Sequence, residues 1–150
     1  MPTLETLTDS HLIFPALEAR DARGILLELA AGLAGAGVVD DPSDLFARLL
    51  EREELGSTAI GHGIAIPHCK LDGLERVAVA VGLAPGGVDF GAADGQPVRV
   101  FFLVASPTRS PGEHLQSLAA ISRWVKGGGR VERLLALRDT AAILELFREA

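Results

Sequence analysis

The run Val98-Arg99-Val100-Phe101-Phe102-Leu103-Val104 constrains the fold of this chain more than any other segment. It is apolar at every position except Arg99 and is far too short to span a bilayer. An apolar run of this length is typical of a strand buried on both faces of a sheet. We therefore expect a central strand here, and such a strand needs a layer of structure against each face.

The rest of the chain supplies those layers. Residues 77–83 alternate larger and smaller apolar side chains, which predicts a second strand, and Leu12–Phe14 predicts a short one. Apolar spacing, capping residues and glycine stops predict helices over residues 22–34, 42–55, 111–125, 131–137 and 139–149. Because helices and strands are interleaved, we predict an α/β fold: a single layered domain over residues 1–150, with a mixed β-sheet covered by helices on both faces.

The net charge and the cysteine count limit the kinds of function that this chain can have. The formal net charge is −6, and no dense cationic stripe is present, which excludes a nucleic-acid interface and suits a basic protein partner. The single cysteine, Cys69, has no internal disulfide partner, as expected for a protein of the reducing cytoplasm. No secretory segment or membrane-inserting span is expected.

The segment from Gly56 to Lys70 is the strongest candidate site. It reads Gly-Ser-Thr-Ala-Ile-Gly-His-Gly-Ile-Ala-Ile-Pro-His-Cys-Lys. Pro67 cannot donate to a sheet ladder, so we expect the strand Ile64–Ile66 to stop there. His68 is then expected where the strand becomes a loop, with its ring free to react.

Residues 56–68 closely resemble the phosphorylation-site signature of enzyme IIA of the bacterial phosphotransferase system, in its fructose, mannitol and nitrogen-regulatory class. The match is residue for residue except at His62, where the family usually has Asn or Glu. The family's arginine–acidic pair resembles Arg52-Glu53, its mid-chain strand entry resembles residues 89–98, and its second histidine resembles His114 followed by Leu115. The resemblance spans about residues 52–124.

The resemblance implies that His68 accepts phosphate, that His114 and Arg52 support the transfer, and that an HPr/NPr-type phosphocarrier protein is the donor. No cofactor and no metal are implied. A neutral imidazole suits this role because its ordinary pKa of about 6.5 leaves the ring unprotonated at neutral pH. We also expect the phosphate to be bound by backbone N–H groups at Gly61 and Gly63 and by the hydroxyls of Ser57 and Thr58.

The supporting residues have local arguments of their own. His114 shares a helix face with Leu118 and Ile121 and lies in a first turn, where free N–H groups favour an anion. We expect Ser110 and Glu113 to form the capping box of that helix. Arg52 offers a permanently charged, bidentate phosphate contact.

The function we favour is that of a phosphoryl carrier of the nitrogen-regulatory type, which acts on regulatory target proteins. One alternative is a component that relays phosphate to enzyme IIB of a fructose- or mannitol-type sugar permease. An alternative from another class is a metal-binding module that uses His62, His68, Cys69 and His114, whose side chains suit zinc. A small-molecule sensor domain is a third alternative, since a fold alone does not fix a function.

Overall fold

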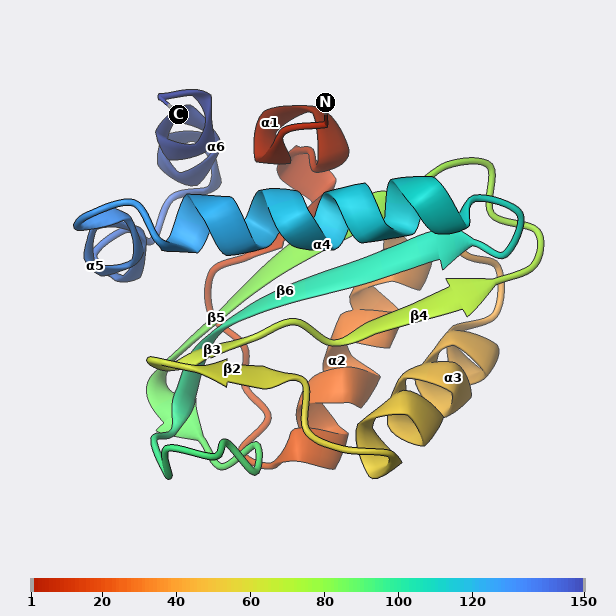
Figure 1. Cartoon of the computed structure of the whole chain (residues 1–150), viewed down its shortest axis with the longest axis horizontal. Helices are drawn as coiled ribbons and strands as arrows, with labels where there is room; N and C mark the ends of the chain where they lie inside the picture. Colours follow the sequence, from red (N-terminus) through yellow and green to blue (C-terminus); the bar gives the residue numbers. More distant parts are fainter. Residues whose placement is uncertain (1, 150) are drawn as a thin grey trace.

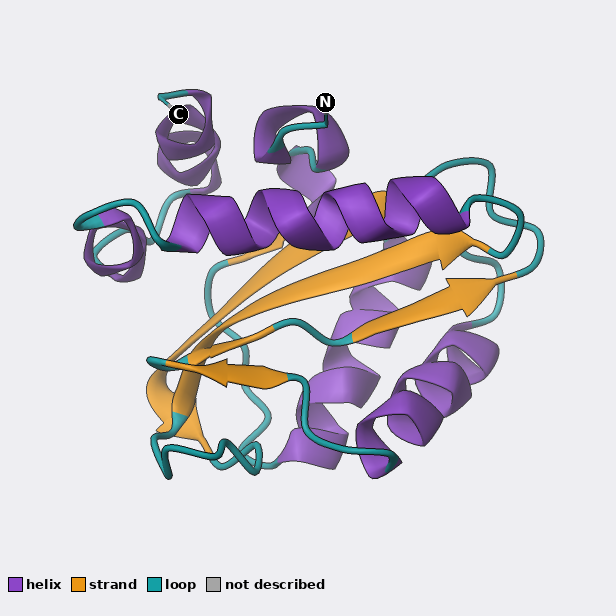
Figure 2. Ribbon diagram, in the orientation of Figure 1, coloured by secondary structure: helices purple, strands orange, loops and turns teal. Residues whose placement is uncertain are grey.

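A mixed β-sheet lies between two layers of helices in the computed structural model, which describes residues 2–149 (Figures 1 and 2). Six strands within these residues form the sheet. Their bounds are β1 (Ile13–Phe14), β2 (Ala59–Gly61), β3 (Ile64–Ala65), β4 (His68–Leu71), β5 (Ala78–Val88) and β6 (Val98–Pro107). The predicted α/β fold with helices on both faces is confirmed.

The sheet is organised around β6. This strand pairs with β5 in antiparallel fashion along one side and with β3 and then β4 in parallel fashion along the other. β1 pairs in parallel with the far side of β5, and β2 pairs in antiparallel fashion with β3. Every residue of β6 except Arg99 is buried, so the prediction of a central strand buried on both faces is confirmed.

The helices divide between the two faces. In Figure 1, α2 (Ala22–Gly35) and α3 (Pro42–Glu54) lie below the sheet, and α4 (Pro111–Val125) lies above it. The short helices α1 (Leu4–Leu7), α5 (Arg130–Leu135) and α6 (Thr140–Arg148) join α4 on the upper side, and a 3-10 turn, η1 (Ser10–Leu12), leads into β1. None of the helices within residues 2–149 is both long enough and apolar enough to cross a membrane.

Two apolar clusters follow from this arrangement because successive strand residues point to opposite faces. Leu103 packs toward α2 and α3, whereas Phe102 and Val104 pack toward α4 and α6. On the α4 side, the ring of Phe102 lies 6.1 Å from that of Trp124 and 6.5 Å from that of Phe147 between centroids. These aromatic rings bind the C-terminal helix to the centre of the sheet.

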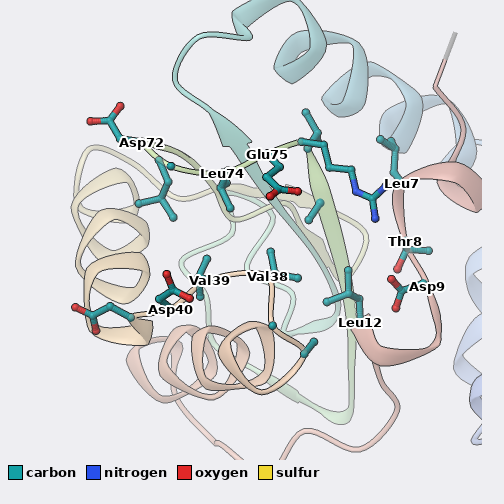
Figure 3. A pocket seen from close by; sticks show the side chains of 18 of the residues that line it. Leu7, Thr8, Asp9, Leu12, Val38, Val39, Asp40, Asp72, Leu74 and Glu75 are labelled. Carbon is teal, nitrogen blue, oxygen red and sulfur yellow. The ribbon is translucent and has the colours of Figure 1, made fainter.

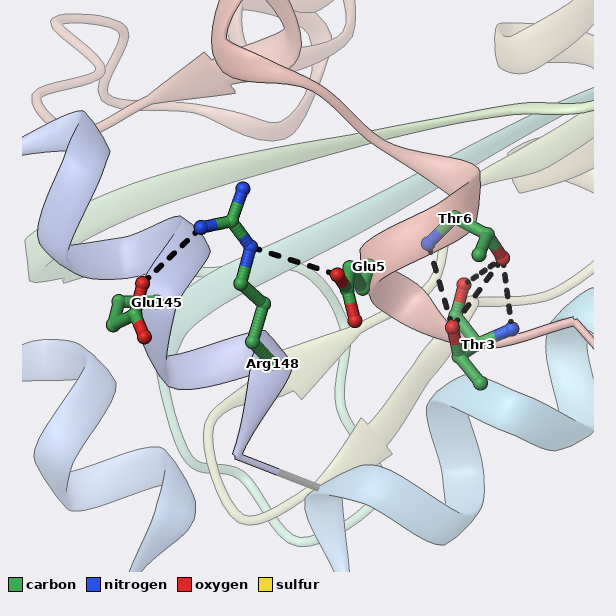
Figure 4. Close-up of polar contacts among 5 residues, drawn as sticks. All are labelled: Thr3, Glu5, Thr6, Glu145 and Arg148. Atoms are coloured by element: carbon green, nitrogen blue, oxygen red, sulfur yellow. Dashed lines mark hydrogen bonds and ion pairs between the residues drawn. The ribbon is translucent and has the colours of Figure 1, made fainter.

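The two ends of the described chain lie beside each other, which the sequence did not predict. The Arg148 guanidinium of α6 lies 3.5 Å from the Glu5 carboxylate of α1 and 3.2 Å from Glu145 (Figure 4). Thr3 and Thr6 form a capping box at the start of α1. The charged groups are about half exposed, so these ion pairs contribute little, and apolar packing of Leu4 fixes the helix.

Helix starts agree with the sequence in one case and differ in another. Asp41 caps α3, as predicted, by accepting a hydrogen bond from Ser43 N, and Pro42 opens that helix. The capping box predicted at Ser110 is wrong, because the Ser110 side chain makes no capping hydrogen bond. The backbone at Ser110 (φ −123°, ψ 57°) departs from the extended conformation usual at a cap, and Pro111 at the first helical position already lacks an N–H.

We predict that Phe102→Ala lowers the free energy of unfolding by about 3–5 kcal/mol, because it opens a cavity beside the rings of Trp124 and Phe147. Chemical denaturation followed by circular dichroism measures this. Leu115→Ala is the matched control, since Leu115 is 66% exposed. Similar losses in the two variants would show that the aromatic cluster is not a main source of stability.

Candidate functional site

β3 ends at Ala65, before Pro67, but a separate strand, β4, begins at His68 along the same side of β6. Ile64 pairs with Val100 and His68 pairs with Val104, so the register on β6 is the same before and after the proline. The Pro67 carbonyl still accepts a hydrogen bond from Val104 N at 2.9 Å. The expectation that His68 begins a loop is therefore wrong, because a proline is tolerated on an edge strand whose free N–H side has no partner.

The position of the His68 ring is fixed by one hydrogen bond. Its Nδ1 lies 2.7 Å from the carbonyl oxygen of Ile66. A carbonyl can only accept, so Nδ1 carries the proton and donates it, and the lone pair of the neutral ring is on Nε2. The side chain is partly exposed, so this nitrogen is accessible from the surface.

The second histidine lies against the first. The ring centroids of His68 and His114 are 5.5 Å apart, with the rings tilted by 56°. His114 is only 5% exposed, on the buried face of α4 that its spacing from Ile121 predicted, and its Nδ1 lies 2.7 Å from the hydroxyl oxygen of Ser106. Burial lowers the pKa of His114 from 6.5 to about 4, with smaller electrostatic contributions from His68 and Lys70, so this ring is neutral at pH 7.

Both rings line a pocket of about 360 Å³ at the edge of the sheet, between α3 and α4. Its other lining residues are Arg48, Glu51, Arg52, Leu55, Cys69 and Lys70. Three cations against one carboxylate make this pocket basic in a chain whose net charge is −6. Such a pocket favours an anion beside Nε2 of His68.

The structure brings together three of the predicted site residues, His68, His114 and Arg52. The Arg52 guanidinium is held at the pocket by a hydrogen bond of 2.9 Å from Nη1 to the carbonyl of Gly56. The sequence analysis missed Arg48 and Lys70. Helical and strand spacing held a signal for both, since Arg48 precedes Arg52 by one helical turn and Lys70 has the strand parity of His68.

The hydroxyls predicted to bind phosphate have other partners. Ser57 Oγ donates to the carbonyl of Phe90 at 2.5 Å, and Thr58 Oγ1 donates to Glu53 Oε1 at 2.6 Å. Neither residue is among those that line the pocket. In this structure both side chains instead fasten the segment between α3 and β2.

The glycines predicted to bind phosphate also have a different setting. Gly61 ends β2, and His62 and Gly63 form the two-residue turn to β3; the φ values of the three residues are 90°, 58° and 80°. Positive φ at the turn explains the glycines, because side chains are strained in that region. None of the three lines the pocket, and His62 lies in the hairpin turn before β3, away from the strand that carries His68.

The turn has a partner of its own in the loop before β6. Asp94 Oδ2 accepts from His62 N at 3.0 Å, and Asp94 Oδ1 accepts from Gln96 N at 3.0 Å. These backbone hydrogen bonds, that from His62 first, lower the pKa of the Asp94 carboxyl. The residues around Gly61 and Gly63 therefore have a structural explanation.

The placement of the four proposed metal ligands does not support the metal-binding alternative. Cys69 packs into the core on the α2 and α3 side of the sheet, and burial raises the pKa of its thiol to about 12. Zinc binds the thiolate, which is disfavoured there. Residues 2–149 contain no cluster of three or more His, Cys, Asp or Glu side chains arranged to hold a metal ion.

A second cavity, of about 670 Å³, lies between the segment from α1 to η1 and the loops that follow α2 and β4 (Figure 3). Its lining is acidic, with Asp9, Asp40, Asp72 and Glu75 among the contributors. Five aspartates and one glutamate line it against a single arginine, Arg76, so it disfavours a phosphoryl group. The basic pocket at His68 is the candidate site for an anion.

Residues 6–150 match the family described as "Phosphoenolpyruvate-dependent sugar phosphotransferase system, EIIA 2". The chain belongs to this family. It is a phosphoryl-transfer protein of the phosphotransferase system, as the resemblance of residues 56–68 predicted.

Both functional branches occur among its relatives. The chain is 39% identical to a nitrogen regulatory protein of Bradyrhizobium diazoefficiens over 94% of this chain and 92% of that protein. It is 34% identical to the fructose-specific EIIA component of Haloferax volcanii over 97% and 95%. The crystal structure of nitrogen regulatory protein IIA-Ntr from Neisseria meningitidis superposes with a TM-score of 0.88 at 26% identity, covering 96% of this chain and 98% of that one.

The low pKa of His114 predicts how the stability of this enzyme IIA depends on pH. His114 is neutral in the folded protein down to about pH 4, whereas in the unfolded chain it gains a proton below about pH 6.5. The unfolded state therefore binds more protons between these values, and the free energy of unfolding should fall as the pH falls through them.

The slope assigned to this one group is at most about 1.4 kcal/mol per pH unit. Urea unfolding of the wild type and His114→Gln at pH 7, 6, 5 and 4 measures it by difference. We expect the variant to lose less stability than the wild type over this range. Parallel profiles would show that His114 is not held neutral.

Proposed function

We propose that His68 accepts the phosphoryl group, on Nε2, from an HPr/NPr-type phosphocarrier protein. The observation that carries this proposal is the hydrogen bond from His68 Nδ1 to the Ile66 carbonyl. It leaves a lone pair on the nitrogen that faces a basic pocket. No proton has to be removed before attack, so no general base is needed.

The reaction balances without a further reactant. The lone pair of His68 Nε2 forms a bond to phosphorus while the bond between phosphorus and the donor's histidine nitrogen breaks, and that nitrogen keeps the electron pair. His68 retains the proton on Nδ1, which the Ile66 carbonyl continues to accept. The ring of the phosphorylated residue then carries positive charge next to a negatively charged phosphoryl group.

Arg52, Arg48 and Lys70 are suited to stabilise the phosphoryl oxygens during transfer. All three line the pocket, and their charge is present before the phosphate arrives. Preorganised cations of this kind act most strongly where charge develops in the transition state. Arg52 also offers paired donors that match the geometry of a phosphate.

His114 supplies a neutral donor in the same pocket. The Ser106 hydroxyl is fully buried, so its proton needs an acceptor, and His114 Nδ1 lies within hydrogen-bond distance. With Nδ1 accepting, the proton of neutral His114 is on Nε2, from where it is available to a phosphoryl oxygen on His68. Neutrality of His114 keeps a second positive charge out of the space beside the reacting ring.

Phosphorylation of His68 is tested directly. The protein is incubated with phosphoenolpyruvate, enzyme I and its matched phosphocarrier, and phosphohistidine is detected as an acid-labile, alkali-stable adduct. We expect stoichiometric uptake by the wild type and none by His68→Ala. His11→Ala is a control, because His11 is exposed in the turn before β1. Full uptake by His68→Ala would refute the assignment.

We further propose that the protein works as a regulatory phosphoprotein of the nitrogen-regulatory type. The 39% identity to a nitrogen regulatory protein over almost the whole chain supports this over relay to a sugar-specific enzyme IIB. The relay remains the second candidate, because a fructose-specific component is 34% identical over a similar length. Both functions need the same site. They differ in the partner protein that recognises or receives the phosphoryl group.

The two candidates predict different binding behaviour. A phosphohistidine adds up to about two negative charges to a pocket whose rim includes the exposed Leu55. A regulatory target should therefore bind the phosphorylated and unphosphorylated forms with different affinities, by about tenfold or more. A relay partner has to dock with both forms.

Binding of candidate partners to the enzymatically phosphorylated protein, the unphosphorylated protein and His68→Ala, measured by calorimetry, separates these cases. Phosphate found on a partner's own residue after mixing would favour relay. Equal affinity of both forms for every partner would contradict the regulatory proposal.

A further inference from the structure

At the open end of the β2–β3 hairpin, Thr58 and Ile66 form only one of the two backbone hydrogen bonds of a regular pair. Ile66 N donates to the Thr58 carbonyl at 3.0 Å, which continues the antiparallel pairing of Ala59 with Ala65 by one residue. In a regular hydrogen-bonded pair, the two residues exchange both N–H···O bonds. The reciprocal bond from Thr58 N to the Ile66 carbonyl would complete the pair, but both of those groups have other partners.

The Thr58 amide is taken by Glu53. Thr58 N donates to Glu53 Oε2 at 2.7 Å, and Thr58 Oγ1 donates to Glu53 Oε1 at 2.6 Å. Two hydrogen bonds to one carboxylate are charge-assisted and are stronger than a bond to a peptide carbonyl. Thr58 is only 5% exposed, so its amide would otherwise need another protein acceptor.

The Ile66 carbonyl is taken by His68. It is the group that accepts from Nδ1 at 2.7 Å and so sets both the orientation of the ring and the nitrogen that is free to react. Ile66 is held on its N-terminal side by the bond to Thr58, and the following Pro67 carbonyl is held by Val104 N. The residue before a proline is also restricted to extended conformations.

We propose that Glu53 is a positioning residue for His68: by binding the Thr58 amide and hydroxyl, it keeps the Ile66 carbonyl free for His68 Nδ1. The inference rests on the proposed role of His68 as the phosphoryl acceptor. Without the carboxylate, the Thr58 amide closes the β2–β3 pair onto the Ile66 carbonyl and competes with the imidazole. The ring then loses its single tautomer and its fixed direction.

With this role for Glu53, both Arg52 and Glu53 at the end of α3 bind the segment that follows the helix. Arg52 donates to the Gly56 carbonyl at 2.9 Å, two residues before the Thr58 groups that bind Glu53. The two adjacent side chains at the C-terminal end of α3 therefore both bind the segment from Gly56 to Thr58. Arg52 adds positive charge to the pocket, whereas Glu53 keeps the His68 ring in a single tautomer.

The test compares Glu53→Ala with the wild type and with Glu54→Ala, whose exposed carboxylate is the next along α3. Nitrogen-15 shifts of the His68 ring report the tautomer without any phosphate donor. Through-hydrogen-bond couplings report the acceptor of the Thr58 amide. The rate of phosphoryl uptake is measured separately with the phosphocarrier in excess.

In Glu53→Ala we expect the ring shifts to move toward the mixture of tautomers found in free histidine and a coupling to appear between Thr58 N and the Ile66 carbonyl. The rate should fall roughly tenfold or more, as is typical when a group that orients a reacting histidine is lost. Glu54→Ala should match the wild type in all three measurements. Thr58→Val should show a smaller change of the same kind and Thr58→Ser none, which keeps the test informative should Glu53→Ala fold poorly.

Unchanged ring shifts in folded Glu53→Ala or Thr58→Val would overturn the proposal, and so would a slower rate with an unchanged tautomer. Either result would show that Glu53 does not control the tautomer of the His68 ring. A wild type that takes up no phosphate while the ring shifts respond to Glu53→Ala would refute the proposed function alone. In that case the competition for the Ile66 carbonyl would still stand.

Discussion

Parallel pairing along one side of β6 is the constraint on which the rest of the site depends. β3 and β4 share one register on that strand although Pro67 interrupts them, so His68 begins β4 at a fixed place opposite Val104. β6 also leads to Ser106, which contacts His114, and then to α4, which carries His114. A single buried strand therefore positions both histidines, and the 5.5 Å between their ring centroids follows from that shared support. A shift of one residue in this pairing would move His68 to the other face of the sheet.

The electrostatics of the site depend on the neutrality of one buried histidine as much as on the positive charge of the pocket lining. Arg48, Arg52 and Lys70 make the pocket basic within an acidic chain, while burial keeps His114 neutral at physiological pH. A protonated His114 would repel the positively charged ring that His68 would carry if it accepts the phosphoryl group as proposed. The neutral ring instead offers a hydrogen-bond donor at no cost in charge repulsion, which suits a reversible phosphoryl carrier.

Much of the fold was predictable because its signals are local. The apolar run at residues 98–104 and the helices with apolar faces and caps, such as that opened by Asp41 and Pro42, agree with the structure. The resemblance of their sequence context to a family singled out His68, His114 and Arg52, and the structure places all three around one pocket. The sequence did not show that hydroxyls, glycines and a histidine close to His68 along the chain lie outside its pocket. Ser57 and Thr58 hold a loop, and Gly61, His62 and Gly63 make a turn.

The sequence by itself determined the type of the central strand, of its neighbour β5 and of the longer helices, because periodicity and residue type act over a few neighbouring positions. Only the tertiary structure decided which groups meet. The acceptor for His68 Nδ1 is a carbonyl two residues earlier, and it is free because a carboxylate on α3 binds an amide that would otherwise pair with it. Likewise, the neutrality of His114 comes from burial under a sheet, and the basic pocket comes from a helix and a strand brought together. Hydrogen-bond competition, burial and the grouping of charges depend on distances through space, which the order of residues along the chain does not contain.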